Sequence, residues 1–227
     1  MSISRAFCQV IIDFDSTFVS VESLDELSRL VLADAPDRDQ RVANIAWITK
    51  EGMEGRMGFG ESLERRLVQF APRREQVAAL AGQLKGLVNP SVLAHRELIR
   101  AHADEVWIVS GGFRELIEPV AAEFGIAPEH VMANEFVWNS AGETTGCNRN
   151  QPLAHDGGKV ESVRRLDLRG RVVMVGDGMT DYAVRQAGLA DVFVAYTETV
   201  DRAPVSLRAD VIARDFGHVA EIAGWQY

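Results

Sequence analysis

The sequence predicts an α/β fold: a Rossmann-like three-layer core around a mostly parallel sheet, with an all-helical domain inserted into it. Two observations predict the core. Short apolar segments rich in β-branched residues recur along the chain, and segments with helical periodicity alternate with them. A third observation predicts the insertion, because one long internal stretch shows helical periodicity without any strand pattern.

The apolar segments are too short for buried helices and are flanked by loop residues, which is typical of strands buried on both faces of a parallel sheet. Polar residues follow several of them, at the sheet edge where open α/β folds bind ligands. Residues 136–145 fit a small hairpin beside that crevice. The predicted strands of the main sheet are residues 7–12, 106–109, 172–175, 192–195 and 211–213.

Helical periodicity characterises the segments between these strands, for example the i, i+3, i+4, i+7 spacing of apolar residues from Phe113 to Val120. The same periodicity fills the whole stretch from residue 21 to residue 90. We therefore expect a discontinuous core domain, residues 1–20 and 91–227, and an inserted helical domain, residues 21–90.

The composition is that of an ordinary globular chain of 227 residues, 47% hydrophobic and 25% charged. Thirty-three acidic against 24 basic residues give a net charge of −9, which disfavours nucleic acid as a partner. No apolar run approaches the roughly 18 residues of a membrane span, and the first residues lack a secretion pattern. Cys8 and Cys147 fit no zinc or paired-cysteine spacing. We therefore expect a cytoplasmic protein without a membrane partner.

Asp13 and Asp15, in the sequence DFDST, follow the first predicted strand. Two adjacent carboxylates favour a hard divalent cation, or a division of labour between an acid and a base. The same sequence also fits a turn with a helix cap at Ser16 or Thr17.

Three further motifs follow strands or begin helices, and each has a structural reading beside its functional one. Ser110, Gly111 and the next glycine fit an anion pocket of backbone N–H groups, or a tight turn. Lys159 begins a helical segment, where a cation is unfavourable unless an anion compensates it, although surface lysines are common. Asp177 and Asp181, in GDGMTD, add two carboxylates, and Asp181 stands where a dinucleotide fingerprint requires glycine.

The joint occurrence of these motifs is more informative than any one of them. Acids, a hydroxyl, backbone donors and a lysine at one crevice suit a divalent cation and a phosphoryl group, whose transfer depends on positioning and charge neutralisation.

In this order, DFDST, SGG, GGK and GDGMTD resemble the four motifs of the haloacid dehalogenase superfamily of phosphatases. The resemblance spans nearly the whole chain and is greatest to the phosphoserine phosphatases, through FDSTFVSVESLDEL, TKEGMEGRMGFGESLERRL, VMANEF and NQPLAHDGGK. It implies a helical cap domain over an α/β core and a Mg²⁺-dependent phosphomonoesterase. The implied substrate is a small phosphorylated amino acid, L-phosphoserine, hydrolysed through an aspartyl phosphate.

The resemblance also implies roles for the acidic residues. Asp13 would be the nucleophile, and Asp15 would protonate the leaving oxygen and then activate water. Mg²⁺ would be bound by Asp13, the backbone carbonyl of Asp15 and Asp177, with Asp181 supporting the metal site from behind.

The remaining implied roles concern the substrate. Its phosphoryl oxygens would be held by Ser110, Gly111 and Lys159. In the cap, Glu22 would bind the ammonium group and Arg66 the carboxylate, although each also fits a solvated helical charge. Above the site, an apolar wall would be formed by Met53 and Phe59, which equally fit plain core positions.

Alternatives to phosphoserine hydrolysis remain open. The same mechanism could serve another small phosphomonoester, or transfer the phosphoryl group to an alcohol such as homoserine. A receiver-like signalling module would instead store the phosphoryl group on an aspartate; Asp15 disfavours it, because a general base nearby shortens the life of an acyl phosphate. Residues 30–49 form a longer segment than these phosphatases lead us to expect, which could shift the cap.

Overall fold

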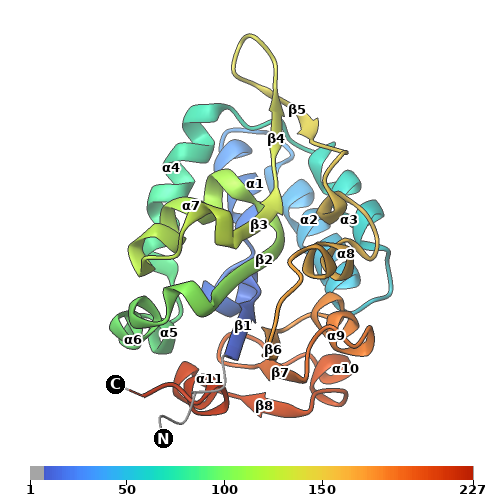
Figure 1. Ribbon diagram of the computed structural model, residues 1–227. Helices are drawn as coiled ribbons and strands as arrows, with labels where there is room; N and C mark the ends of the chain where they lie inside the picture. Colours follow the sequence, from blue (N-terminus) through green and yellow to red (C-terminus); the bar gives the residue numbers. More distant parts are fainter. Residues whose placement is uncertain (1–7, 227) are drawn as a thin grey trace, which may run out of the picture.

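A six-stranded parallel sheet forms the centre of the molecule in the computed structural model, which describes residues 8–226 (Figure 1). The strand order is β3-β2-β1-β6-β7-β8, and every neighbouring pair is parallel. The α/β class predicted from the sequence is confirmed; Phe7, the first residue of a predicted strand, lies outside the described residues. The strands are β1 (Cys8–Ile12), β2 (Val106–Phe113), β3 (Val131–Asn134), β6 (Arg171–Gly176), β7 (Val192–Tyr196) and β8 (Val211–Ala213).

Helices cover both faces of this sheet. Successive strand residues point to opposite faces, so Val10 and Ile12 pack into one apolar cluster with α7 and α11, while Ile11 packs into a second with α8, α9 and α10. The predicted three layers are therefore present. The helices of the two outer layers are α7 (Arg114–Ala121), α11 (Phe216–Ala223), α8 (Gly158–Arg165), α9 (Met179–Gln186) and α10 (Ala203–Ser206); two short helices, α5 (Pro90–Ala94) and α6 (Arg96–Ala101), precede β2.

Helices α1 to α4 lie within residues 21–90, the stretch where the sequence predicted only helices; we call these four the helical insert. Each contributes a buried residue, Leu27, Ile45, Leu63 and Leu80, to the same apolar cluster as Val10. The insert therefore shares a continuous core with one face of the sheet. Its helices are α1 (Ser23–Val31), α2 (Arg38–Met53), α3 (Phe59–Leu67) and α4 (Arg74–Leu84).

The chain enters and leaves the helical insert at adjacent points. Val19 and Val88 form an isolated antiparallel bridge. On either side of it, the Ser20 N–H donates to the Leu87 carbonyl (2.8 Å), and the Asn89 N–H donates to the carbonyl of residue 18 (3.0 Å). These contacts join the two connecting segments to one another beside the paired strands β1 and β2.

Two features of the main sheet differ from the prediction. β3 was not predicted, because Val131 is the only β-branched residue in its four positions, and pairing with β2 defines it. β2 extends to Phe113, so Ser110 and its two glycines belong to the end of a strand, with the register shifting between Val109 and Phe113.

The predicted hairpin is present as β4 (Phe136–Trp138) and β5 (Thr144–Cys147), which project beyond the sheet (Figure 1). It contacts the connection between α3 and α4. The Thr144 N–H donates to the Pro72 carbonyl (3.0 Å), and Arg73 forms an ion pair with Glu143 (2.8 Å).

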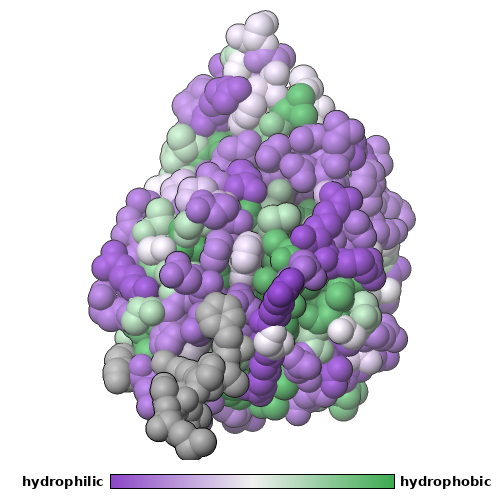
Figure 2. Space-filling model, viewed as in Figure 1, coloured by the Kyte–Doolittle hydropathy of each residue, from purple (hydrophilic) through white to green (hydrophobic). Residues whose placement is uncertain are grey.

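The face of the molecule in Figure 2 is mostly hydrophilic, with hydrophobic residues in separate areas between hydrophilic ones. Large exposed apolar side chains, such as Trp47, Val68 and Leu207, come from different elements, which is usual for single surface residues. Within residues 8–226, no helix combines the length and apolar character needed to cross a bilayer. Cys8 and Cys147 are buried, unpaired thiols.

Candidate active site

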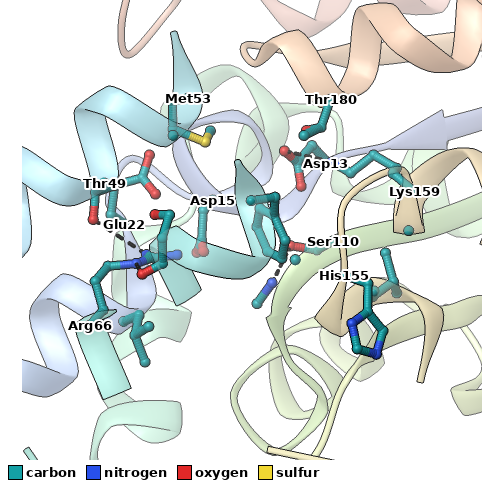
Figure 3. A pocket seen from close by; sticks show the side chains of 18 of the residues that line it. Asp13, Asp15, Glu22, Thr49, Met53, Arg66, Ser110, His155, Lys159 and Thr180 are labelled. Carbon is teal, nitrogen blue, oxygen red and sulfur yellow. Dashed lines mark hydrogen bonds and ion pairs between the residues drawn. The ribbon is translucent and has the colours of Figure 1, made fainter. Parts of the chain in front are cut away.

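One pocket gathers side chains from distant parts of the sequence. Nine of the eleven predicted site residues line it. Figure 3 shows Thr49, Met53, Glu22 and Arg66 on one side and Asp13, Lys159, Ser110 and His155 on the other, with Asp15 between them. The remaining two predicted residues, Asp177 and Asp181, lie beside Asp13 in an acidic cluster.

Asp13 is held where β1 ends. Its N–H donates to the Val175 carbonyl (2.9 Å), which ties it to β6. Its Oδ1 accepts the Phe14 N–H (2.7 Å), and its Oδ2 lies 2.9 Å from Lys159 Nζ. Both carboxylate oxygens thus have fixed partners, and the group is buried.

A single tight turn, Phe14–Phe18, follows Asp13. Ser16 has φ of 53°, in the left-handed region, at a cost of the order of 1 kcal/mol for a residue with a side chain. Its hydroxyl donates to Glu22 Oε1 (2.7 Å), while the Thr17 hydroxyl donates to Asp177 Oδ1 (3.1 Å). The alternative of a helix cap at these two residues is therefore wrong, because both hydroxyls donate to carboxylates.

Asp15 points toward the start of α1. One of its oxygens accepts the Ser23 N–H (3.0 Å) and the other accepts the Ser23 hydroxyl (3.0 Å). Burial raises the pKa of Asp15 to about 7, with the Asp13 charge adding to the effect and the bonds from Ser23 opposing it. A carboxyl with this pKa can both donate and accept a proton near neutral pH.

Lys159 is 6% exposed, which excludes the reading of a surface lysine. Its Nζ lies 2.9 Å from Asp13 and 2.6 Å from Asp181. Burial alone would lower the pKa of this ammonium, but the two carboxylates outweigh it and the net pKa is raised. The first residue of α8 must be glycine, because a Cβ on Gly158 would lie 2.1 Å from the Pro152 carbonyl oxygen.

Asp13, Asp177 and Asp181 present oxygens that all lie within 4.8 Å of one another, and all three groups are buried. Burial raises the pKa of Asp177 and raises that of Asp181 to about 8, with Asp13 contributing to both. Hard oxygen donors that crowd together in a buried site fit a metal cation, even though Lys159 and Arg202 already neutralise part of their charge. The family resemblance implied Asp13, Asp177 and the Asp15 backbone carbonyl as metal ligands, with Asp181 behind them; in the structure the carboxylates that converge are those of Asp13, Asp177 and Asp181.

Arg202 belongs to the same cluster, and sequence reasoning missed it. It lies in the loop after β7 and is 11% exposed as a side chain. Its Nε donates to Asp177 Oδ2 (2.8 Å) and an Nη donates to Glu22 Oε1 (3.2 Å). The loop that carries Arg202 contains no recognisable motif. The sequence contains one indirect indication of such a residue, because several carboxylates that converge in one site require a further cation.

The Glu22 carboxylate therefore has two partners within the protein, because it accepts hydrogen bonds from Ser16 and Arg202. Burial raises its pKa well above the usual range, and the charges of Asp15 and Asp177 add to this. It is not a solvated helical charge.

Arg66 is 7% exposed and also differs from a solvated helical charge. Its Nε donates to the Ser62 carbonyl and its Nη1 to the Thr49 hydroxyl, both at 3.3 Å. These acceptors are neutral and take two of the five donors of a guanidinium. The side chain lines the pocket, where an anionic group would find its remaining donors.

Two apolar side chains of the insert lie against the end of β2 and the start of α9. The Phe59 ring packs on Gly111 so closely that a Cβ there would lie 2.4 Å from the ring. The Met53 methyl lies 3.3 Å from the position a Cβ would take on Gly178. Both residues lie where an apolar wall was predicted.

The site thus combines a buried lysine with several carboxylates at the carboxyl ends of parallel strands. Comparison with known proteins identifies the class of enzyme to which this arrangement belongs. The sequence profile of the haloacid dehalogenase-like hydrolases matches residues 10–184, and the chain belongs to this family.

Its relatives narrow the class to phosphatases. The chain is 32% identical over 209 residues to the chloroplastic phosphoserine phosphatase of Arabidopsis thaliana, covering 91% of this chain and 68% of that one. It is 30% identical over 218 residues to the phosphoserine phosphatase of Mus musculus, covering 93% and 92%. The crystal structure of a phosphoserine phosphohydrolase-like protein from Francisella tularensis has a TM-score of 0.85 at 29% identity, covering 94% and 98%. The predicted class, a phosphoric monoester hydrolase similar to phosphoserine phosphatase, is confirmed.

Proposed function

We propose that this chain hydrolyses L-phosphoserine to serine and phosphate through an aspartyl phosphate on Asp13, with Mg²⁺ as its metal. One observation carries the proposal. The pocket that holds Asp13 and Lys159 also holds Arg66 and Glu22, so groups suited to a phosphate, a carboxylate and an ammonium face one small space. The names of the relatives agree with this substrate.

In the first step, an oxygen of Asp13 attacks phosphorus, and the bond from phosphorus to the ester oxygen breaks. The departing oxygen takes a proton from the Asp15 carboxyl, for which the pKa of about 7 is suited. Lys159 and the backbone around Ser110 and Gly111 bind the phosphoryl oxygens as charge redistributes.

In the second step, Asp15, now a carboxylate, takes a proton from water as the water oxygen attacks phosphorus. The bond from phosphorus to Asp13 breaks and the Asp13 carboxylate is restored. The bonds from Ser23 hold Asp15 during both steps, which fixes its orientation between the pocket and α1.

The metal would be held by Asp13, Asp177 and Asp181, or by the first two with the backbone of Asp15. When bound, it neutralises charge on the carboxylates and on the phosphoryl group. Mg²⁺ suits this set because it prefers carboxylate oxygens and is commonly shared between one or two carboxylates and a phosphate.

At the other end of the substrate, Arg66 would grip the carboxylate with its remaining donors, and Glu22 would attract the ammonium. Glu22 already forms an ion pair with the Arg202 guanidinium, so the substrate's ammonium would be a second cation beside the Glu22 carboxylate. Met53 and Phe59 would exclude water above the scissile bond.

A phosphate-release panel tests the substrate. With added Mg²⁺, wild-type protein should prefer phosphoserine over phosphothreonine, phosphohomoserine, phosphoethanolamine and sugar phosphates. Equal rates across the panel would refute a dedicated phosphoserine phosphatase.

Arg66→Ala should then lower kcat/KM for phosphoserine by about 10²-fold, because a charge-assisted bidentate contact is lost, and lower that for p-nitrophenyl phosphate by less than about threefold. Arg65→Ala is the matched control, since the neighbouring Arg65 pairs with Glu61 on the surface. Equal losses with both substrates would exclude Arg66 as the carboxylate site.

A further inference from the structure

Helix α3 begins without a side-chain cap of its own. Its N-cap residue is Gly58, so no side chain there can accept the N–H groups of the first turn. The acceptor comes from elsewhere in the chain: Asp156 Oδ1 accepts the Gly60 N–H at 2.9 Å. Asp156 lies three residues before Lys159, in the loop that precedes α8.

The contact is closely fitted on both sides. A Cβ on Gly58 would lie 2.7 Å from Asp156 Oδ2, and a Cβ on Gly60 would lie 3.4 Å from the Ala154 carbonyl oxygen. The first distance is too short for a Cβ and the second is an ordinary contact, so Gly58 in particular leaves room for the Asp156 carboxylate. The negative carboxylate also complements the positive end of the helix dipole.

The two segments joined by this contact carry residues that line opposite ends of the pocket. α3 carries Phe59 in its first turn and Arg66 in its last, whereas the loop leads directly into Lys159. A change in the docking of α3 would therefore alter the spacing between Arg66 and Lys159.

We propose that Asp156 is a positioning residue that caps α3 from the opposite side of the pocket and thereby fixes the distance between the phosphate-binding and carboxylate-binding groups. The docking itself is independent of the substrate; its effect on phosphoserine rests on the function proposed above. Asp156 touches no reacting atom in this scheme.

Replacing an N-cap residue by alanine changes a helix equilibrium by about 2- to 30-fold, and asparagine caps about as well as aspartate. Asp156 is exposed, so the lower part of that range applies. Asp156→Ala should raise KM for phosphoserine by about 3- to 10-fold with a smaller change in kcat. Asp156→Asn should remain within about twofold of wild type.

Glu64→Gln is the matched control. Glu64 also joins α3 to the segment before Lys159, through an ion pair with Arg149 at 3.3 Å, but both side chains are about half exposed or more. Such a pair contributes little, so this variant should stay within about twofold of wild type.

Hydrogen exchange at the amides of residues 59–62, measured in the full chain without substrate, tests the docking independently of activity. Exchange should be faster in Asp156→Ala and near wild type in Asp156→Asn and Glu64→Gln. Unchanged exchange in Asp156→Ala, or equal acceleration in Asp156→Asn, would overturn the proposal. If wild-type protein does not hydrolyse phosphoserine, the proposed function fails, while the exchange result still decides the role of Asp156.

Discussion

The two oxygens of Asp13 have different partners, a backbone N–H and a lysine ammonium, so the side chain is oriented before any substrate binds. An orientation of this kind lowers the entropic cost of an attack on phosphorus. The neighbouring Asp15 is held by Ser23 in a different direction, and the two carboxyl groups are thereby given different environments.

Asp13→Asn should reduce phosphate release by at least about 10³-fold, because an amide can accept the Phe14 N–H but is a poor nucleophile. The circular dichroism spectrum should be unchanged. Asp167→Asn makes the same chemical change at an exposed position and should retain full activity. Turnover of Asp13→Asn within tenfold of wild type would remove Asp13 from the role of nucleophile.

Arg202→Met should lower the free energy of unfolding by about 2 kcal/mol in the presence of a chelator, because Asp177 and Glu22 lose the largely enclosed cation that they share. Urea denaturation measures this. Arg185→Met breaks a half-exposed pair with Asp210 and should cost less than about 1 kcal/mol. Equal losses in the two variants would show that Arg202 has no special part in the cluster.

Residues with a local pattern were predictable from the sequence, and Arg202 was not. Asp13, Ser110, Lys159 and Asp177 each stand next to a strand or helix signal, and parallel strands place such positions at one edge. The position of Arg202 is set by tertiary contacts alone, in a loop whose composition carries no comparable signal.

At the scale of elements, α3 and the end of β2 pack closely where the Phe59 ring lies on Gly111. The glycine of this motif therefore has a packing role in addition to any contact with phosphate.

Gly111→Ala should destabilise the protein by about 1–3 kcal/mol, because the added methyl group would overlap the Phe59 ring. Phe59→Ala also destabilises by itself, through lost burial. The double variant should be more stable than the sum of the two single losses predicts, as measured by urea denaturation of all four proteins. Simple additivity would contradict close packing at this point.

The helices and most strands were predictable because their apolar spacing reflects burial directly. β3 was missed because its four residues owe their strand conformation to pairing with β2, which no local pattern reports. The strand conformation of Ser110 to Gly112 was missed for a related reason, since glycines suggest a turn wherever their hydrogen-bonding partner is unknown.

At the scale of the whole molecule, three of the acidic residues, Asp13, Asp177 and Asp181, form one buried cluster. Asp177 and Asp181 have raised pKa values because burial and neighbouring carboxylates oppose their ionisation. A bound cation would relieve this cost and would stabilise the native state by an amount that grows with the logarithm of the cation concentration above its dissociation constant.

Removal of divalent metal with a chelator should therefore abolish phosphate release, and added MgCl₂ should restore it. MgCl₂ should also raise the thermal midpoint by a few degrees relative to NaCl of equal ionic strength, since screening alone is matched in that comparison. Undiminished activity in the chelator would exclude a metal-dependent mechanism.

The bridge between Val19 and Val88 has a consequence for how such a protein can diversify. Because the segments that enter and leave the helical insert pair with each other, the insert is a loop whose two ends are already held together. Lengthening that loop costs little entropy, since the penalty grows only with the logarithm of its length. A different set of helices joined to the sheet through the same pair of bridged segments would leave the strands of the sheet undisturbed.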